Sequence, residues 1–291
     1  MSPAEVFTEY RPLLFTIAYE ILGSAADAED ALQDSYLRWS EADPACIDNP
    51  RAYLAQVVTR QALNQLRSAG RRREDYVGSW LPEPIRTGPD ASEDALLAES
   101  VSMAMLLVLE TLSPDERAVF VLREVFGFSH REVAEAVGKS EAAVRQTSHR
   151  ARSHVLSRRR RFEPSSAAAQ ELAGQFLSAA VTGDIQALMD LMAPDVVEIS
   201  DGGGKVNAAR RPVVGRERVA RFMAGLARTG PADLRFEVGL FNSLPSVLIY
   251  SGEHLDTVAM FEVTDALVSG IYLVRNPDKL TGVAQSRPLT R

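Results

Sequence analysis

The fold of this chain is most constrained by residues 112–155, LSPDERAVFVLREVFGFSHREVAEAVGKSEAAVRQTSHRARSHV. Ser113 and Ser129 each stand three residues before a glutamate, the spacing at which a serine hydroxyl and a glutamate carboxylate satisfy free N–H groups at a helix start. Pro114 suits the first position of a helix, and Ser140 suits the cap of a later one. The segment therefore predicts three capped helices.

The turn between the last two of these helices is typical of a helix-turn-helix. Ala134, Gly138 and Val144 stand where that motif needs a small residue, a left-handed turn and an apolar residue packed between the helices. Ala151 and Val155 continue the apolar stripe of the third helix. Another face of that helix has residues spaced for a DNA major groove: Arg145, Ser148, His149 and Arg152. A solvated basic helix in a small bundle is the alternative interpretation.

The net charge of −7 argues against a nucleic-acid-binding protein, but the distribution of charge along the chain favours one. Five arginines and no acid lie between Arg60 and Arg73, and seven arginines and no acid lie between Arg145 and Arg161. Such stripes bind phosphates through counterion release. Acid gathers instead in residues 27–34 and 90–99, which favours a basic protein partner.

Composition excludes several other classes of protein. The 291 residues allow two or three domains, and a hydrophobic content of 46% is ordinary for a globular protein. No apolar run is long enough for a membrane span, and the first residues do not read as a signal peptide, so we expect a cytoplasmic protein. Cys46 is the single cysteine, so an ordinary thiol is expected there and no disulfide or zinc site.

Residues 6–41 predict two helices joined at Gly23, and the second has polar side chains at its outward positions. These residues are Asp27, Glu29, Asp30, Gln33 and Asp34. Acids in a first turn can simply complement the helix dipole. Asp34 lies beyond that turn, so the set also suits a docking face for a basic coiled coil.

A third helix is predicted at residues 51–73, and its polar face has Arg60, Asn64 and Arg67, followed by Arg71 to Arg73. Arginines near aromatic rings suit single-stranded DNA, although a solvated charged face is the alternative. Prolines and glycines exclude a continuous helix in the next segment, so we predict a linker ordered around Trp80 and Leu81. Helical periodicity returns at residues 94–112.

The composition changes after Pro164, and the rest of the chain predicts an α+β domain. Helices are expected at 167–183, 184–193 and 215–229, a strand at 195–203, and four antiparallel strands at 234–241, 246–252, 254–266 and 267–276. This order resembles a SnoaL-like, NTF2-like cone, which implies a pocket. Acid/base candidates for such a pocket are Asp184, Asp195, Asp201, His254 and Asp256. Solvated or capping side chains are the alternative.

The glycines of DGGGK, residues 201–205, do not make a nucleotide site. Ile199 stands where a phosphate loop needs glycine, and Val206 stands where it needs serine or threonine. Three glycines at a strand end instead indicate a tight loop that another backbone can approach closely.

Taken together, the N-terminal motifs resemble a known family. DAEDALQDSYLRW, the basic helix and the helix-turn-helix resemble regions 2 and 4 of bacterial extracytoplasmic-function sigma factors over residues 5–157. The resemblance implies that Asp27, Asp30, Gln33 and Asp34 contact the β′ clamp helices of RNA polymerase, while region 4 also contacts the β flap. It implies that Arg60, Asn64 and Arg67 face the −10 strand, while Arg71 is expected to bind DNA evenly across sequences. It implies that Arg145, Ser148, His149 and Arg152 bind the −35 element.

Three further motifs resemble the signatures of one sigma subgroup, group 41, in which a SnoaL-like extension follows region 4. They are WLPEP at 80–84, DGGGK at 201–205 and NPDKL at 276–280. The resemblance implies regulation in cis, in place of a separate anti-sigma factor. The implied interdomain residues are Trp80, Leu81, Pro82, Asp201, Gly202, Gly203, Gly204, Lys205, Asn276, Pro277 and Asp278.

The sequence therefore predicts a multidomain sigma factor with two all-α regions and an α+β cone. The expected parts are a region 2 domain at 1–75, a linker at 76–93, a region 4 domain at 94–162 and a SnoaL-like domain at 167–291. Expected partners are core RNA polymerase and promoter DNA, with no membrane, no cofactor and no catalysis. Two alternatives remain: a SnoaL-like isomerase or hydrolase with a DNA-binding appendage, and a helix-turn-helix repressor whose cone binds a ligand.

Overall fold

The computed structural model describes residues 2–42, 47–74, 76–88, 94–158, 166–231 and 233–291, without the side chains of 69–74. Cys46 lies outside these ranges. The chain forms two compact units. The first groups residues 1–75, 104–160 and 287–291, and the second groups residues 76–103 and 161–286.

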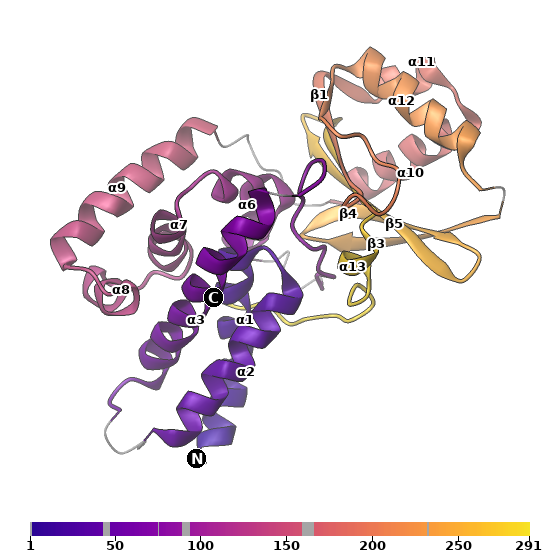
Figure 1. Cartoon of the computed structure of the whole chain (residues 1–291). Helices are drawn as coiled ribbons and strands as arrows, with labels where there is room; N and C mark the ends of the chain where they lie inside the picture. Colours follow the sequence, from indigo (N-terminus) through magenta and orange to yellow (C-terminus); the bar gives the residue numbers. More distant parts are fainter. Residues whose placement is uncertain (1, 43–46, 75, 89–93, 159–165, 232) are drawn as a thin grey trace. The chain divides into compact units, whose positions relative to one another are not determined.

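The first unit begins with three helices that pack on one another, α1 (Pro3–Leu22), α2 (Ala25–Glu41) and α3 (Pro50–Glu74) (Figure 1). α1 ends at Gly23, whose φ of 69° closes the helix in the left-handed conformation. The Ser24 side chain accepts a hydrogen bond from the Asp27 N–H and so caps α2. The three predicted helices are confirmed.

The same unit contains α6 (Met103–Glu110), α7 (Pro114–Phe120), the π-helix η2 (Val121–Val125), α8 (His130–Val137) and α9 (Glu141–Arg158). Both predicted capping boxes are present, at Ser113 and at Ser129. Gly138 has a φ of 68°, as the predicted turn requires. The predicted helix-turn-helix is confirmed, whereas the widened π-turn was not predicted.

The second unit contains the segment 76–103, with the short helix α5 (Ala95–Ser100), and an α+β domain. Its other helices are α10 (Ala167–Thr182), α11 (Ile185–Asp190), α12 (Arg216–Thr229) and α13 (Pro277–Leu280). Its strands are β1 (Met192–Asp201), β2 (Val213–Val214), β3 (Leu234–Phe241), β4 (Leu244–Ser251), β5 (His254–Thr264) and β6 (Leu267–Val274).

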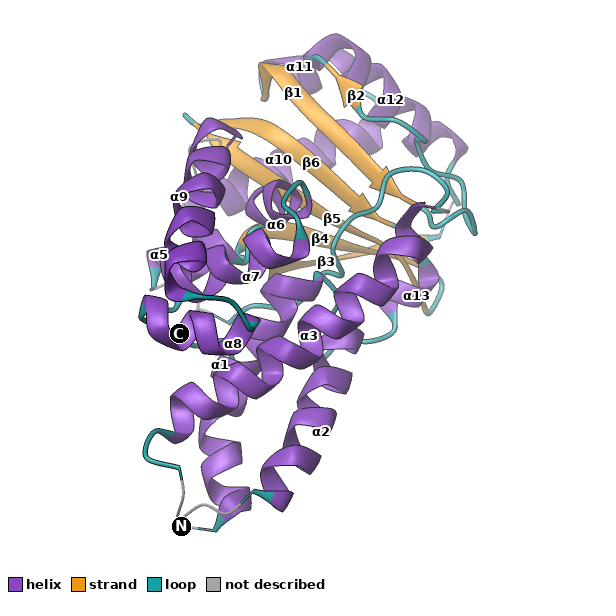
Figure 2. Ribbon diagram, turned by 60° about the vertical axis from the view of Figure 1, so that its left-hand side comes forward, coloured by secondary structure: helices purple, strands orange, loops and turns teal. Residues whose placement is uncertain are grey.

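The strands form one sheet in the order β2-β1-β6-β5-β4-β3 (Figure 2). The predicted meander of four antiparallel strands is confirmed as β3 to β6. β1 pairs with β6 in parallel, which the sequence did not predict. The α+β class expected for this part of the chain is confirmed.

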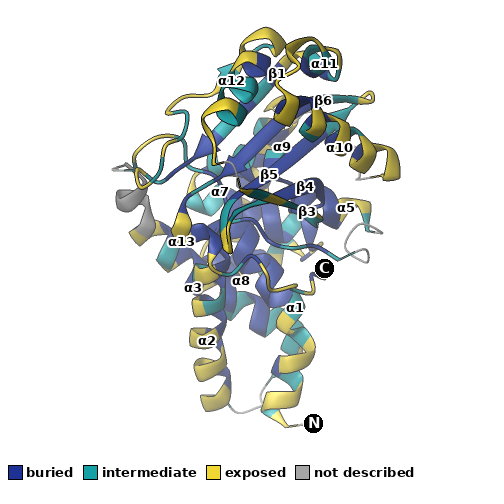
Figure 3. Ribbon diagram, turned by 90° about the vertical axis from the view of Figure 1, so that its right-hand side faces the viewer, coloured by how far each residue is buried: buried dark blue, intermediate teal, exposed yellow. Residues whose placement is uncertain are grey.

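The core of the α+β domain lies between the sheet and its helices. α10 packs on β4 and β6, and α12 packs on β1. Phe176 of α10 is buried, and its ring centre lies 5.3 Å from that of Phe261 on β5. Figure 3 shows the central strands buried and much of the helical surface exposed. The segment 76–103 contacts this sheet at the end of β1 and at the β3–β4 turn.

Candidate linker anchor and nucleic-acid interface

Asp201, at the end of β1, binds the segment that precedes α5. Its Oδ1 accepts a hydrogen bond from the Tyr76 hydroxyl at 2.5 Å, and its Oδ2 accepts one from the Leu81 N–H at 2.8 Å. Lys279 of α13 forms an ion pair with the same Oδ2 at 2.7 Å. Both charged side chains are buried, with exposed fractions of 0% for Asp201 and 8% for Lys279. We call Tyr76, Leu81, Asp201 and Lys279, with the residues packed around them, the linker anchor.

The ammonium group of Lys279 is held on several sides. It donates to the Leu81 carbonyl oxygen as well as to Asp201. It also lies 4.1 Å from the ring centre of Trp80 and 5.2 Å from that of Tyr76. A buried ammonium is stable only where such partners replace its hydration. The linker anchor therefore depends on all of these contacts being made together.

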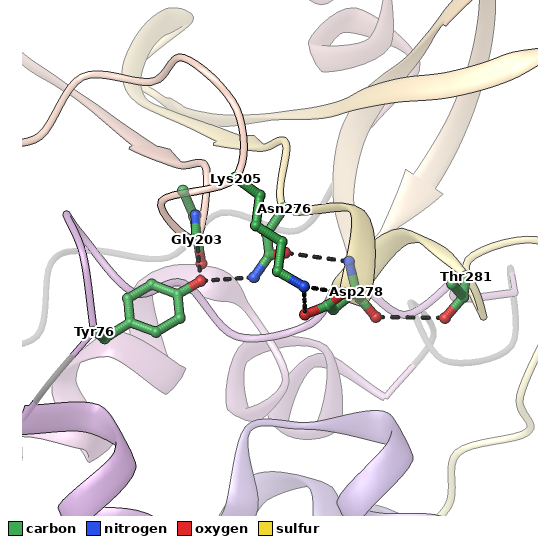
Figure 4. Close-up of polar contacts among 7 residues, drawn as sticks. Tyr76, Gly203, Lys205, Asn276, Asp278 and Thr281 are labelled. Atoms are coloured by element: carbon green, nitrogen blue, oxygen red, sulfur yellow. Dashed lines mark hydrogen bonds and ion pairs between the residues drawn. The ribbon is translucent and has the colours of Figure 1, made fainter.

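Asn276 connects the linker anchor to the last motif (Figure 4). Its Nδ2 donates to the Tyr76 hydroxyl at 2.8 Å, and its N–H donates to the Asp201 carbonyl oxygen at 2.9 Å. Its Oδ1 accepts from the Asp278 N–H at the start of α13. Lys205 forms an exposed ion pair with Asp278 at 2.6 Å.

The glycines of DGGGK are required by close packing. A Cβ on Gly203 would lie 2.4 Å from the Asn276 Nδ2, and one on Gly202 would lie 2.5 Å from the Val206 carbonyl oxygen. Gly204 has a φ of 71° and lies against Val77. The expected tight loop with close neighbours is confirmed, although one of those neighbours is an amide side chain rather than backbone.

Burial, followed by the hydrogen bond to the Asp201 carboxylate, raises the pKa of Tyr76. The phenol therefore stays protonated and remains a donor to Asp201 at any physiological pH.

A second attachment holds the linker at the β3–β4 turn. The Asn242 Oδ1 accepts from the Ile85 N–H at 3.1 Å, and its Nδ2 donates to the Val101 carbonyl oxygen at 2.8 Å. The Thr87 N–H donates to the Leu240 carbonyl oxygen at 3.0 Å. Asn242 has a φ of 50°, as a two-residue hairpin turn requires. It was missed by sequence reasoning, because a turn asparagine is ordinarily explained by the turn alone.

The structure brings most of the predicted interdomain residues together. Trp80, Leu81, Asp201, the three glycines, Lys205, Asn276 and Asp278 all lie at the linker anchor. Pro82 is buried beside Leu81 in sequence, and Pro277 is the first residue of α13. Sequence reasoning missed Tyr76 and did not single out Lys279, although Lys279 belongs to the quoted motif.

The predicted acid/base candidates do not form a catalytic group. The Asp184 side chain caps α11, and the Asp256 carboxylate binds Arg275 at 3.0 Å. Asp195 and His254 are exposed, and Asp201 belongs to the linker anchor. Among the described residues, no group of three His, Cys, Asp or Glu side chains could hold a metal ion.

The basic face of α3 contacts α7 and α8 of the same unit. The Arg60 guanidinium donates to the main-chain carbonyl oxygen of Glu135 at 2.7 Å, and Gln56 donates to the same oxygen at 3.2 Å. The Arg67 guanidinium binds the Asp115 carboxylate at 2.9 Å. Asn64 is exposed, and the Arg71 side chain lies outside the described residues.

Asp115 is shared by two cations, Arg67 and Lys139, and the second lies at 2.6 Å. Partial burial alone would raise the pKa of Asp115, but the hydrogen bonds from Lys139 and Arg67 outweigh burial and hold the pKa below its usual value. The carboxylate is therefore ionised at neutral pH and stabilises the contact between α3 and α7.

Arg117 makes a buried contact between α7 and α1. Its side chain is 2% exposed, its Nε donates to the Glu20 carbonyl oxygen at 2.8 Å, and it forms an ion pair with Glu110. A guanidinium buried in this way fixes its partners closely, because losing one of them would leave charge unpaired in the interior.

On α9 the residues predicted to bind the major groove differ in their exposure to solvent. Arg145, His149 and Arg152 are exposed, whereas Ser148 is buried. Arg145 pairs with Glu141, and Arg152 lies 3.7 Å from the Glu124 carboxylate. On α2, Asp30, Gln33 and Asp34 are exposed and Asp27 is partly exposed.

The last residues of the chain, 287–291, belong to the first unit. Arg287 lies 3.6 Å from the Glu29 carboxylate of α2, and its guanidinium lies 5.5 Å from the ring centre of Phe15. Arg11 of α1 binds the same carboxylate at 2.5 Å. No described helix is long and apolar enough to cross a membrane.

Comparison with known proteins identifies the family. Residues 6–72 match the model of Sigma-70 region 2, and residues 102–155 match the model of Sigma-70 region 4. The chain is 39% identical over 290 residues to the ECF RNA polymerase sigma factor SigJ of Mycobacterium tuberculosis, covering 95% of this chain and 92% of the relative. The chain belongs to the ECF RNA polymerase sigma factors.

Two further similarities extend over almost the whole sigma factor. The crystal structure of the Mycobacterium tuberculosis sigma factor SigJ aligns with a TM-score of 0.76 and 35% identity, covering 97% of this chain and 99% of that one. The probable ECF sigma factor SigI of the same organism is 27% identical over 93% of this chain and 92% of its own length. The similarity therefore includes the C-terminal α+β domain.

Sigma factors bind core RNA polymerase and promoter DNA and do not catalyse a reaction, which agrees with the expectation of a non-enzyme. Region 2 of this sigma factor contains α1 to α3, and region 4 contains α6 to α9. The segment between the two regions contains the residues that bind Asp201 and Asn242.

Proposed function

We propose that this sigma factor directs polymerase to promoters with −10 and −35 elements and is regulated in cis by its C-terminal domain. One observation carries the proposal: residues 76–103, which connect region 2 to region 4 along the chain, pack within the C-terminal unit. A linker held by buried hydrogen bonds is not free to extend. The C-terminal domain then limits how far apart the two DNA-binding regions can move.

The contacts of α3 support a closed resting state for the two regions. Arg60 and Arg67, expected at the −10 strand, are bonded to Glu135 and Asp115 of region 4. Each bond occupies part of a guanidinium group that a phosphate would otherwise bind, so the contact with region 4 competes with DNA. Promoter affinity then falls in proportion to the fraction of molecules in the open state. Opening, and not synthesis of a separate anti-sigma factor, is the regulated step in this proposal.

The −10 strand would bind along α3, where a pocket offers both an aromatic ring and hydrogen-bond donors. Its lining residues are Arg38, Tyr53, Gln56, Val57 and Arg60. A ring beside guanidinium groups suits an unstacked base whose backbone follows the arginines. Asn64, Arg67 and Arg71 would continue this surface along the strand.

The remaining contacts are assigned to other faces. Arg145, His149 and Arg152 would bind the −35 duplex, and Ser148 would join them only if its side chain becomes exposed. The β′ clamp helices of core polymerase would bind the polar face of α2: Asp27, Asp30, Gln33 and Asp34. Region 4 would also bind the β flap. All of this takes place in the cytoplasm, where the polymerase acts.

Tyr76→Phe tests regulation through the linker. The change removes the hydroxyl that bonds to Asp201 and Asn276 but keeps the ring beside Lys279. We expect run-off transcription with core polymerase, from a promoter selected out of a randomised library, to increase several-fold. Tyr250→Phe is the matched control, because its hydroxyl bonds only weakly, at 3.3 Å, to Glu237 in the same domain.

Two outcomes would contradict different parts of the proposal. If Tyr76→Phe and Tyr250→Phe both transcribe like the unmodified chain, the linker anchor does not regulate in cis. If no variant supports specific initiation with core polymerase, promoter recognition itself is wrong for this chain.

A further inference from the structure

The two edges of the six-stranded sheet differ in length and in protection. β2 forms one edge with two residues, Val213–Val214, whereas β3 forms the other edge with eight, Leu234–Phe241. The pairing of β3 with β4 runs along all eight residues without a bulge, and β3 contains neither proline nor lysine. Short edge strands, bulges, prolines and lysines are devices that keep sheet edges from pairing with other chains. β3 lacks these devices and is therefore an edge suited to pairing.

The main-chain polar groups of β3 that face away from β4 belong to its even-numbered residues. The Thr87 N–H donates to the Leu240 carbonyl oxygen at 3.0 Å, so the polar groups of Leu240 point away from β4. This direction alternates from residue to residue along a strand, so the N–H and C=O groups of Leu234, Phe236 and Val238 point to the same side. In the described part of the chain, no main-chain group bonds to these three residues on that side.

The same residues have apolar side chains on one face of the sheet. Phe236 and Val238 lie opposite Ile249 and Val247 of β4, so they share the face of the core. Val238 is nevertheless 76% exposed. On its own an exposed valine is ordinary. Beside unpaired main-chain groups on a long edge, it extends the surface that a further strand would cover.

The other face of β3 has two opposite charges, one on each side of Phe236 in sequence. Arg235 and Glu237 form an ion pair with each other along the strand. An antiparallel copy of β3, with Phe236 opposite Phe236, would place the Arg235 of each copy opposite the Glu237 of the other. The same register places Leu234 opposite Val238. β3 is therefore complementary to itself in charge and in apolar character.

We propose that β3 pairs with the β3 of a second copy of this chain, antiparallel and centred on Phe236, so that two C-terminal sheets join edge to edge. In this register the outward N–H and C=O groups of Phe236 meet those of the second copy, as a hydrogen-bonded antiparallel pair requires. The arrangement has the twofold symmetry usual for homodimers. One pair of strands buries little surface, so the dimer is weak and depends on concentration. It requires neither DNA nor polymerase, and it does not depend on regulation in cis.

Charge reversal tests this register, with sedimentation velocity of the full-length chain over a series of concentrations as the measurement. Arg235→Glu and Glu237→Arg should each raise the dissociation constant of the dimer at least about tenfold, because like charges then lie opposite each other at two symmetric positions. An equimolar mixture of the two variants should dimerise like the unmodified chain, because every facing pair again has opposite charges. Arg218→Glu, on the exposed surface of α12, is the matched control and should leave the dimer unchanged.

Val238→Pro is a second, independent variant. It removes an outward N–H that β4 does not use, so it should abolish the dimer while the domain stays folded. A dimer that persists in this variant would overturn the proposal.

Other results would also overturn it. An unmodified chain that stays monomeric at the highest concentration at which it is soluble would leave this edge to an extended segment of another protein. A dimer that both charge-reversed variants keep would use another surface. If each of those variants is monomeric and their mixture is monomeric as well, the two copies do not pair in this register.

Discussion

Asp201 illustrates how one residue can join distant segments. Its two carboxylate oxygens bind Tyr76, Leu81 and Lys279, and its carbonyl oxygen accepts the N–H groups of Arg275 and Asn276. A carboxylate buried with a single ammonium group is stable only when its other lone pairs are also satisfied. The linker supplies those donors. The structure around Asp201 therefore forms only together with binding of the linker.

Lys279→Met should therefore destabilise the C-terminal domain by about 3–5 kcal/mol, because it leaves the buried Asp201 carboxylate without its ion-pair partner. Lys205→Met is the matched control, since Lys205 pairs with Asp278 at the surface and should contribute less than about 1 kcal/mol. Urea denaturation of both variants, followed by tryptophan fluorescence, measures the difference.

Similar urea midpoints for the two variants would mean that the buried pair is no stronger than the exposed one. In that case the linker would be held mainly by Asn242 and by apolar contacts.

At single positions, the sequence predicted the linker anchor better than the buried carboxyl group of Glu198. DGGGK and NPDKL stand out as motifs, whereas Glu198 stands in the strand pattern VVEIS, where alternation suggests that Val197 and Ile199 face the core. The opposite holds: Glu198 and Ser200 are buried on the face of the core, and Val197 and Ile199 are half-buried on the other face. Alternation identifies the core face only when the other face is solvated.

At the scale of elements, the contact of α3 with α7 and α8 engages two of the side chains expected to bind DNA, Arg60 and Arg67, although both remain exposed. Asp115 holds Arg67 with an ion pair, while Arg60 is held by a main-chain carbonyl group. An acidic side chain that pairs with a DNA-binding arginine competes with phosphate for the same donor groups. Under the proposed function, Asp115 and Arg67 would therefore have opposite effects on DNA binding, although they stabilise the same contact.

Asp115→Asn should raise the affinity of the free sigma factor for single-stranded −10 DNA several-fold, because it releases Arg67. Arg67→Ala should lower that affinity, because it removes a phosphate-binding cation. Fluorescence anisotropy with a labelled oligonucleotide, at one fixed salt concentration, measures both effects. If the two variants changed the DNA affinity in the same direction, the ion pair would affect DNA binding only by stabilising the folded protein.

Helices and the antiparallel meander could be predicted from caps, periodicity and turn residues, since these are local signals. The parallel pairing of β1 with β6 could not, because the two strands are far apart in sequence and no local pattern specifies their register. The π-helix Val121–Val125 was missed for a related reason, because its residues continue an ordinary helical pattern.

At the scale of the whole molecule, the C-terminal domain has two attachments to region 2, one covalent through the linker and one noncovalent through Arg287 of the tail. The linker leaves α3 towards the linker anchor, and residues 287–291 return to the first unit after the last strand and α13. Two tethers raise the effective concentration of one unit near the other more than either tether does alone. Loss of the second attachment should therefore weaken any regulation in cis.

Arg287→Ala tests that attachment. It removes the ion pair with Glu29 and the contact with Phe15, so promoter-directed run-off transcription should increase several-fold. Arg11→Ala is the control, because Arg11 binds the same carboxylate from within region 2 and leaves the tail in place. Equal transcription by the two variants would exclude a role for the tail.

Arg60 and Gln56 bind a carbonyl oxygen of the backbone and not the Glu135 side chain. Every amino acid has a main-chain carbonyl oxygen. Substitutions at position 135 therefore keep this contact between region 2 and region 4. Under the proposed function, substitutions on the outer surface of α8 would therefore leave the contact that stabilises the closed state unchanged.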